Sequence, residues 1–198
     1  MYPFYIVILL VMALSTPKRF KPGFSFLLLL TAFSLTVILS GCPFSSVYQI
    51  DKEPQFLVDD NYLGKWAAIT IDDIGMKRPV KMILSRKTDY EYDIIFTGYF
   101  DELNKRNIAY NDTIKGTGYM SLVDNRQFFN IKVKELFYLA EFSFEDGKIS
   151  MLPLCEHFTN RIVKSNEDLR KSIQWHFKTR LYPLYDDPFC LKNMVRVN

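Results

Sequence analysis

The sequence predicts a mainly β domain: an antiparallel meander of about eight strands that closes into a barrel or forms a strongly curved sheet. Residues 90–97 alternate large apolar and polar side chains, which is the period of a half-buried strand. Similar short runs recur along the chain. One helical segment interrupts them and a single strand follows it. This order favours an up-and-down barrel, because closure removes the exposed sheet edges. An open α+β sheet with a packed helix is the alternative.

The predicted strands are short runs rich in aromatic and β-branched residues, several of them strictly alternating. They cover residues 64–72, 80–85, 90–97, 117–124, 127–133, 138–145, 148–151 and 190–197. Asp146-Gly147 lies between two of these runs, and this dipeptide accepts the positive φ angles of a two-residue hairpin turn. We therefore expect residues 138–151 to form a hairpin.

The one long helix is predicted to begin after Ser165. Ser165 followed three residues later by Asp168 resembles a capping box, with Asp in place of Glu. Apolar residues then recur at helical spacing, at Leu169, Ile173, His176 and Phe177. Pro183 prevents the helix from continuing far. The pattern predicts an amphipathic helix that packs one stripe against the sheet.

The start of the first predicted strand resembles a known barrel family. Tyr62-Leu63-Gly64-Lys65-Trp66 is similar to the Gly-x-Trp of lipocalins, which place a basic residue across the barrel end from that tryptophan. Arg196 is the matching position here. Residues 60–198 thus resemble the small lipocalin-like domains of many bacterial lipoproteins, although in lipocalins proper the long helix follows the eighth strand. The resemblance implies that Trp66 and Arg196 pack together at one end of a barrel.

The N-terminal region resembles the signal of a bacterial lipoprotein. A basic cluster, Lys18, Arg19 and Lys21, precedes an apolar run over residues 24–41, which is the general form of a secretory signal. Leu39-Ser40-Gly41-Cys42 resembles the lipobox. The resemblance implies cleavage before Cys42 and a diacylglyceryl group, with acyl chains such as palmitate, on its thiol. An uncleaved membrane anchor and an ordinary signal peptide are the alternatives.

These features predict three parts of the chain. Residues 1–41 are the signal segment, with Met12 as an alternative translation start. Residues 42–60 are the lipidated cysteine and a tether, because they lack sustained periodicity. Residues 61–198 are the β-rich globular domain. Pro43 follows the cysteine, where Asp retains enterobacterial lipoproteins at the inner membrane, so the resemblance favours the outer membrane of the cell envelope.

The charge after the signal segment is balanced. The chain has 25 Lys and Arg residues and 22 Asp and Glu residues. The signal holds three of the basic residues and none of the acidic ones, so the remainder has no net charge. This balance predicts no basic face for nucleic acid or anionic lipid. The expected contact with a membrane is the lipid on Cys42.

Few residues qualify as candidate sites. Cys155 and Cys190 are the pair that could form a disulfide in an oxidising compartment, and two buried thiols are the alternative. Tyr90, Tyr92 and Phe96 form the alternating aromatic face that we expect any apolar ligand to contact. The sequence contains no nucleophile elbow, phosphate-binding loop or His-Glu-x-x-His motif. We therefore expect no catalytic residues, metal or cofactor, and no enzymatic activity.

Three functions remain in this order. The first is an accessory or scaffolding lipoprotein that holds a protein partner near the membrane, which predicts a packed interior and an uncovered apolar surface. The second is a lipocalin-like binder of a small apolar ligand, which predicts a cavity lined by inward strand residues. The third is an unrecognised hydrolase, which requires a polar cluster in a pocket.

Overall fold

The computed structural model describes residues 43–71, 76–98, 103–104 and 107–197. The chain divides into two compact units, residues 1–40 and 41–198, and the description below concerns the second. The predicted signal segment, the lipobox and Cys42 lie outside the described residues. Among the described residues, no helix has the length and apolar character needed to cross a membrane.

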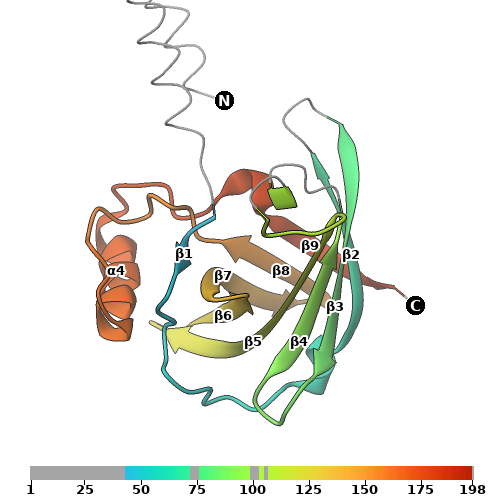
Figure 1. Cartoon of the computed structure of the whole chain (residues 1–198), viewed down its shortest axis with the longest axis horizontal. Helices are drawn as coiled ribbons and strands as arrows, with labels where there is room; N and C mark the ends of the chain where they lie inside the picture. The colour runs from blue at the N-terminus through green and yellow to red at the C-terminus, as the bar shows by residue number, and fades with distance from the viewer. Residues whose placement is uncertain (1–42, 72–75, 99–102, 105–106, 198) are drawn as a thin grey trace, which may run out of the picture. The chain divides into compact units, whose positions relative to one another are not determined.

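Eight antiparallel strands form a closed barrel, which confirms the predicted fold class and rules out the open sheet (Figure 1). Each strand pairs with the next along the chain, and the last returns to the first, with Val195 opposite Ala67. The strands are β2 (Gly64–Ile71), β3 (Lys77–Arg86), β4 (Tyr92–Thr97), β5 (Thr113–Val123), β6 (Arg126–Val133), β7 (Leu136–Glu145), β8 (Lys148–Pro153) and β9 (Leu191–Val197).

The predicted hairpin at Asp146-Gly147 is confirmed, with φ angles of 51° and 70° at the two turn residues and β7 paired to β8. Strand β5 begins earlier than predicted. Its inward positions include Gly116 and Gly118, where a Cβ atom would lie only 2.5 and 2.7 Å from carbonyl oxygens of β6. Only glycine allows this close approach. Because glycines occupy inward positions, the apolar alternation that marks a strand is missing there.

The barrel interior is filled by the inward side chains of its strands. Trp66, Met82 and Phe129 are among the largest, and none exposes more than 1% of its surface. The remaining buried members of this core are Val58, Val80, Leu84, Tyr92, Ile94, Phe96, Met120, Ile131, Val133, Ala140, Phe142, Ile149, Met151, Leu191 and Met194. The alternation seen in the sequence therefore separates an apolar interior from an outer wall.

A second apolar cluster lies on the outer wall, beneath the helix α4 (Asn166–Thr179). Leu169 and Ile173 of the helix are fully buried against outward residues of the barrel such as Phe128 and Leu139. The helix begins as predicted, because the side chain of Ser165 accepts a hydrogen bond from the Asp168 amide at 3.0 Å. It ends at Arg180, which adopts a left-handed conformation, and a short 3-10 turn, η2 (Asp187–Phe189), precedes β9.

Residues 43–59, here called the strap, differ from the predicted tether because they lie against the barrel. The short strand β1 (Ser45–Ser46) pairs with β7, and Pro43 forms a bridge with Cys155. Ile50 is buried in the cluster beneath α4, and Val58 in the barrel core. The 3-10 turn η1 (Asp60–Tyr62) then leads into β2. Single apolar residues within a polar segment produce no periodicity, so the sequence pattern did not reveal this docking.

Candidate functional site

The aromatic face predicted to contact a ligand is divided by the barrel wall. Tyr92 and Phe96 point into the core and expose 1% and 8% of their surface, whereas Tyr90 is 43% exposed. Tyr90 belongs to the turn before β4, so the alternation of the strand does not extend to it. Inside the barrel, the Tyr92 ring lies 5.2 Å from that of Phe129, and the Tyr92 hydroxyl accepts a hydrogen bond from the Asp59 amide at 2.9 Å. Tyr92 thus joins the strap to the barrel core.

Trp66 and Arg196 meet at one end of the barrel, as the lipocalin resemblance implies. They are opposite each other on β2 and β9, and the Arg196 guanidinium carbon lies 4.9 Å from the Trp66 ring centroid. Trp66 donates its indole N–H to the Tyr62 carbonyl at 2.9 Å, and Arg196 donates to the Asn61 carbonyl at 2.6 Å. The pair therefore closes the barrel end and holds η1 over it.

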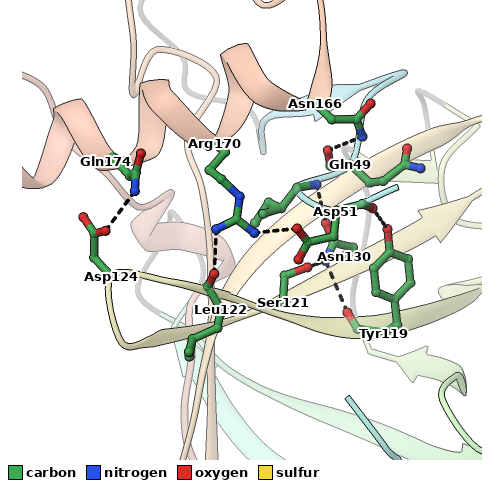
Figure 2. Close-up of polar contacts among 11 residues, drawn as sticks. Gln49, Asp51, Tyr119, Ser121, Leu122, Asp124, Asn130, Asn166, Arg170 and Gln174 are labelled. Atoms are coloured by element: carbon green, nitrogen blue, oxygen red, sulfur yellow. Dashed lines mark hydrogen bonds and ion pairs between the residues drawn. The ribbon is translucent and has the colours of Figure 1, made fainter. Parts of the chain in front are cut away.

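A buried polar network holds the middle of the strap, and the sequence pattern did not predict it (Figure 2). Asn130 is fully buried on the outer wall. Its side-chain oxygen accepts from the Ile50 amide at 2.8 Å, and its amide nitrogen donates to Ser121 Oγ at 2.8 Å. The Tyr119 hydroxyl donates to the Asp51 carbonyl. Burial and the nearby Asp51 carboxylate raise the pKa of Tyr119, so its hydroxyl keeps the proton that it donates.

The helix completes this network from the opposite side of the strap (Figure 2). Arg170 pairs with the Asp51 carboxylate and donates to the Leu122 carbonyl at 2.8 Å. Asn166 donates to the Gln49 carbonyl at 2.6 Å. The strap is therefore held between the barrel wall and α4. Partners this far apart in sequence leave no local motif, so only the fold identifies them.

The two described cysteines are free thiols, which is the second of the two alternatives that the sequence left open. Cys155 donates its thiol hydrogen to the Pro183 carbonyl at 2.9 Å. Burial raises the pKa of Cys190 to about 11. Beside them, burial and the neighbouring Asp187 raise the pKa of Asp186 to about 6. Asp186 is 4% exposed, and its Oδ2 atom has no hydrogen-bond partner among the described residues.

Among the residues that the structure describes, the other candidate groups are not clustered as a metal site would require. His176 is buried on the apolar side of α4, where its Nδ1 lies 3.2 Å from the Phe158 carbonyl oxygen. Within the described part of the chain, no three His, Cys, Asp or Glu residues are grouped so that they could hold a metal ion. Comparison of the chain with protein-family models, curated proteins and solved structures found no match. Functional proposals therefore rest on its own sequence and geometry.

Proposed function

We propose that the protein is a membrane-tethered lipoprotein of the bacterial cell envelope, with a barrel that serves as a non-enzymatic accessory or scaffolding domain. Cys42 carries the lipid, and the proline that follows it favours the outer membrane. The observation that carries the scaffolding role is the filled barrel interior, where the residues that a ligand-binding barrel uses to line a cavity pack against one another. This packing favours the scaffolding role over the lipocalin-like carrier.

The docked strap fixes the place on the barrel where the proposed lipid anchor joins the domain. Pro43, the residue directly after the proposed lipid site, is bridged to Cys155, and the Phe44 amide donates to the Leu154 carbonyl at 2.7 Å. A flexible tether would let the domain rotate freely relative to its anchor. The docked strap instead keeps the first residue after the proposed lipid site next to the barrel.

The lipid is tested by the mass of the mature protein extracted from membranes of a bacterial host. We expect the wild-type N-terminal peptide to begin at Cys42 and to carry diacylglycerol. Cys42→Ser should abolish this modification, whereas Cys190→Ser is the matched control and should keep it. An unmodified Cys42 in protein recovered from the membrane fraction would overturn the proposed lipid anchor.

The scaffolding role is tested separately by native mass spectrometry of the same extracted protein. We expect the mass of the lipidated chain alone once the detergent is removed in the gas phase. A further small molecule that is bound at one copy per chain and leaves on denaturation would overturn the scaffolding role. That result would favour the apolar-ligand carrier instead.

A further inference from the structure

The outer wall of the barrel opposite α4 carries lysines interleaved with aliphatic side chains. Strands β2 and β3 lie on the side of the barrel away from the helix (Figure 1). Their outward residues, with those of β4, β5, β8 and β9, form what we call the lysine face. It consists of Lys65, Ala67, Ile69, Lys81, Ile83, Ile95, Lys115, Lys148 and Val195.

Strand register brings these residues into two neighbouring rows. In one row, Lys148 is opposite Val195, Val195 opposite Ala67, and Ala67 opposite Lys81. In the other, Lys65 is opposite Ile83, Ile83 opposite Ile95, and Ile95 opposite Lys115. Neighbouring strands are about 4.8 Å apart, so each row is a continuous strip across the wall. All four lysines are exposed, as are Ile69 at 70% and Val195 at 47%.

The four lysines of this face outnumber the acidic residues beside them. None of its four lysines forms an ion pair with an acidic residue in the described part of the chain. Asp93 is the one acidic residue on the described outward positions of β2, β3 and β4, and Glu145 of β7 lies opposite Lys148. The total charge of the domain is balanced, but on this wall the lysines are in excess.

The composition of the face favours a lipid surface over a protein surface. Protein interfaces are enriched in tyrosine, tryptophan and arginine and depleted in lysine. The lysine face has the opposite composition. Lysine places its aliphatic stem along apolar surface while its ammonium reaches a charged group, and basic clusters are attracted to anionic lipid headgroups. We propose that the lysine face docks the barrel on an anionic phospholipid bilayer.

The docked face adds to the proposed function a second membrane contact besides Cys42. A lipid anchor holds the chain at a membrane of any charge, whereas lysines bind only a negatively charged one. Contact through the face would lay the barrel wall on the bilayer and leave α4 directed away from it. The orientation of the domain would then depend on lipid composition and on salt.

The test is the chemical accessibility of lysines in the full-length protein, reconstituted in vesicles. A membrane-impermeant acylating reagent modifies exposed lysines, and peptide mass spectrometry measures the extent at each position. Vesicles of phosphatidylcholine are compared with vesicles that also contain phosphatidylglycerol. We expect modification of Lys65, Lys81, Lys115 and Lys148 to fall several-fold with the anionic lipid and to recover in high salt. Lys178 on α4 should not change.

Two double variants separate the effect of charge on the lysine face from the effect of total net charge. Lys81→Gln with Lys115→Gln removes two charges from the face, and Lys171→Gln with Lys178→Gln removes two from exposed positions of α4. We expect the first to remove most of the lipid-dependent protection of Lys65 and Lys148. The second should leave it intact. Circular dichroism checks that both variants keep the fold.

Several results would overturn the proposal: equal modification in both kinds of vesicle, protection that does not depend on lipid charge, or equal effects of the two variants. Flotation with neutral vesicles tests the lipid anchor on Cys42 alone, because the lysines bind only a negatively charged membrane. Protein that floats with neutral vesicles but shows no lipid-dependent protection would overturn docking by the lysine face. The lipid anchor would then remain supported. Protein that floats only with anionic vesicles would support docking by the lysine face and overturn the lipid anchor.

Discussion

The side-chain oxygen of Asn130 accepts a hydrogen bond from the backbone amide of Ile50 at 2.8 Å, across 80 residues of chain. Asn130 is fully buried on the outer wall of β6, where an apolar residue would normally face the helix. Its amide nitrogen donates to Ser121 Oγ, so both ends of the side chain are used. The barrel wall thus contains a polar site that binds the strap.

Replacing Asn130 by Ala should lower the free energy of unfolding by about 1–3 kcal/mol, because the Ile50 amide loses its partner in a buried position. Amide hydrogen exchange at Ile50 should accelerate. Urea unfolding measures the first effect and exchange mass spectrometry the second. Asn61→Ala is the exposed control and should change stability by less than about 0.5 kcal/mol. Equal effects of the two variants would contradict the role given to Asn130.

The ion pair between Arg170 and Asp51 should stabilise the strap measurably. It is partly buried, with side-chain exposures of 31% and 13%, whereas Lys171 and Glu167 on the same helix are exposed by 59% and 74%. A double-mutant cycle with alanine should give a coupling energy of about 1 kcal/mol for Arg170 and Asp51. The same cycle for Lys171 and Glu167 should give about 0–0.5 kcal/mol. A larger coupling in the exposed pair would refute this ranking.

Trp66→Ala should be the more damaging change at the barrel end. Removing a fully buried indole costs about 3–5 kcal/mol, whereas Arg196→Ala loses a partly exposed cation–π contact worth about 1 kcal/mol. Thermal and urea unfolding measure both. Lys65→Ala, on the outward position next to Trp66, is the matched control and should have little effect. An effect of Trp66→Ala near zero would remove the argument that it closes the barrel.

Ionisation of Asp186 should destabilise the fold as pH rises. Its pKa is raised from 3.8 in the unfolded chain to about 6, chiefly by burial. Between these values the folded state binds more protons than the unfolded state, so the free energy of unfolding falls with increasing pH.

Asp186→Asn should not show this fall. The stability of the wild type relative to the variant should decrease between pH 4 and pH 7 by on the order of 1–3 kcal/mol. Urea unfolding across this range is the measurement, and Asp93→Asn is the exposed control. Parallel pH profiles of wild type and Asp186→Asn would exclude a raised pKa at this position.

The thiols of Cys155 and Cys190 should be unreactive in the folded protein and free after unfolding. Burial raises the pKa of both, and alkylation requires the thiolate. Without reductant, iodoacetamide should modify the two cysteine peptides only after denaturation, as peptide mapping will report. A linked Cys155–Cys190 peptide would mean that the pair is oxidised.

The strands and the helix could be predicted because their signals lie between near neighbours in sequence. Alternation along β4 and β7, positive φ at Asp146-Gly147 and the cap at Ser165 each depend on residues a few positions apart. The early start of β5 was missed for a local reason as well, since glycines replace the apolar residues there. The order of the elements also favoured a closed barrel over an open sheet.

The strap and the site that binds it could not be predicted in this way. Ile50 and Val58 are single apolar residues among polar neighbours. No sequence feature marks Asn130 as the residue that binds the strap. Their partners come from other strands and from α4. A segment without periodicity was therefore interpreted as a tether, although it is bound along the barrel wall.

The sequence by itself determined the period of each element and the turns between neighbouring strands, because these depend on steric and hydrogen-bonding preferences within a few residues. It also determined the total charge. The tertiary structure decided how that charge is distributed. Lys65, Lys81, Lys115 and Lys148 come from four strands, and only the register of closed pairing makes them neighbours. Charge totals add along the chain, whereas a surface is formed by residues that folding brings together.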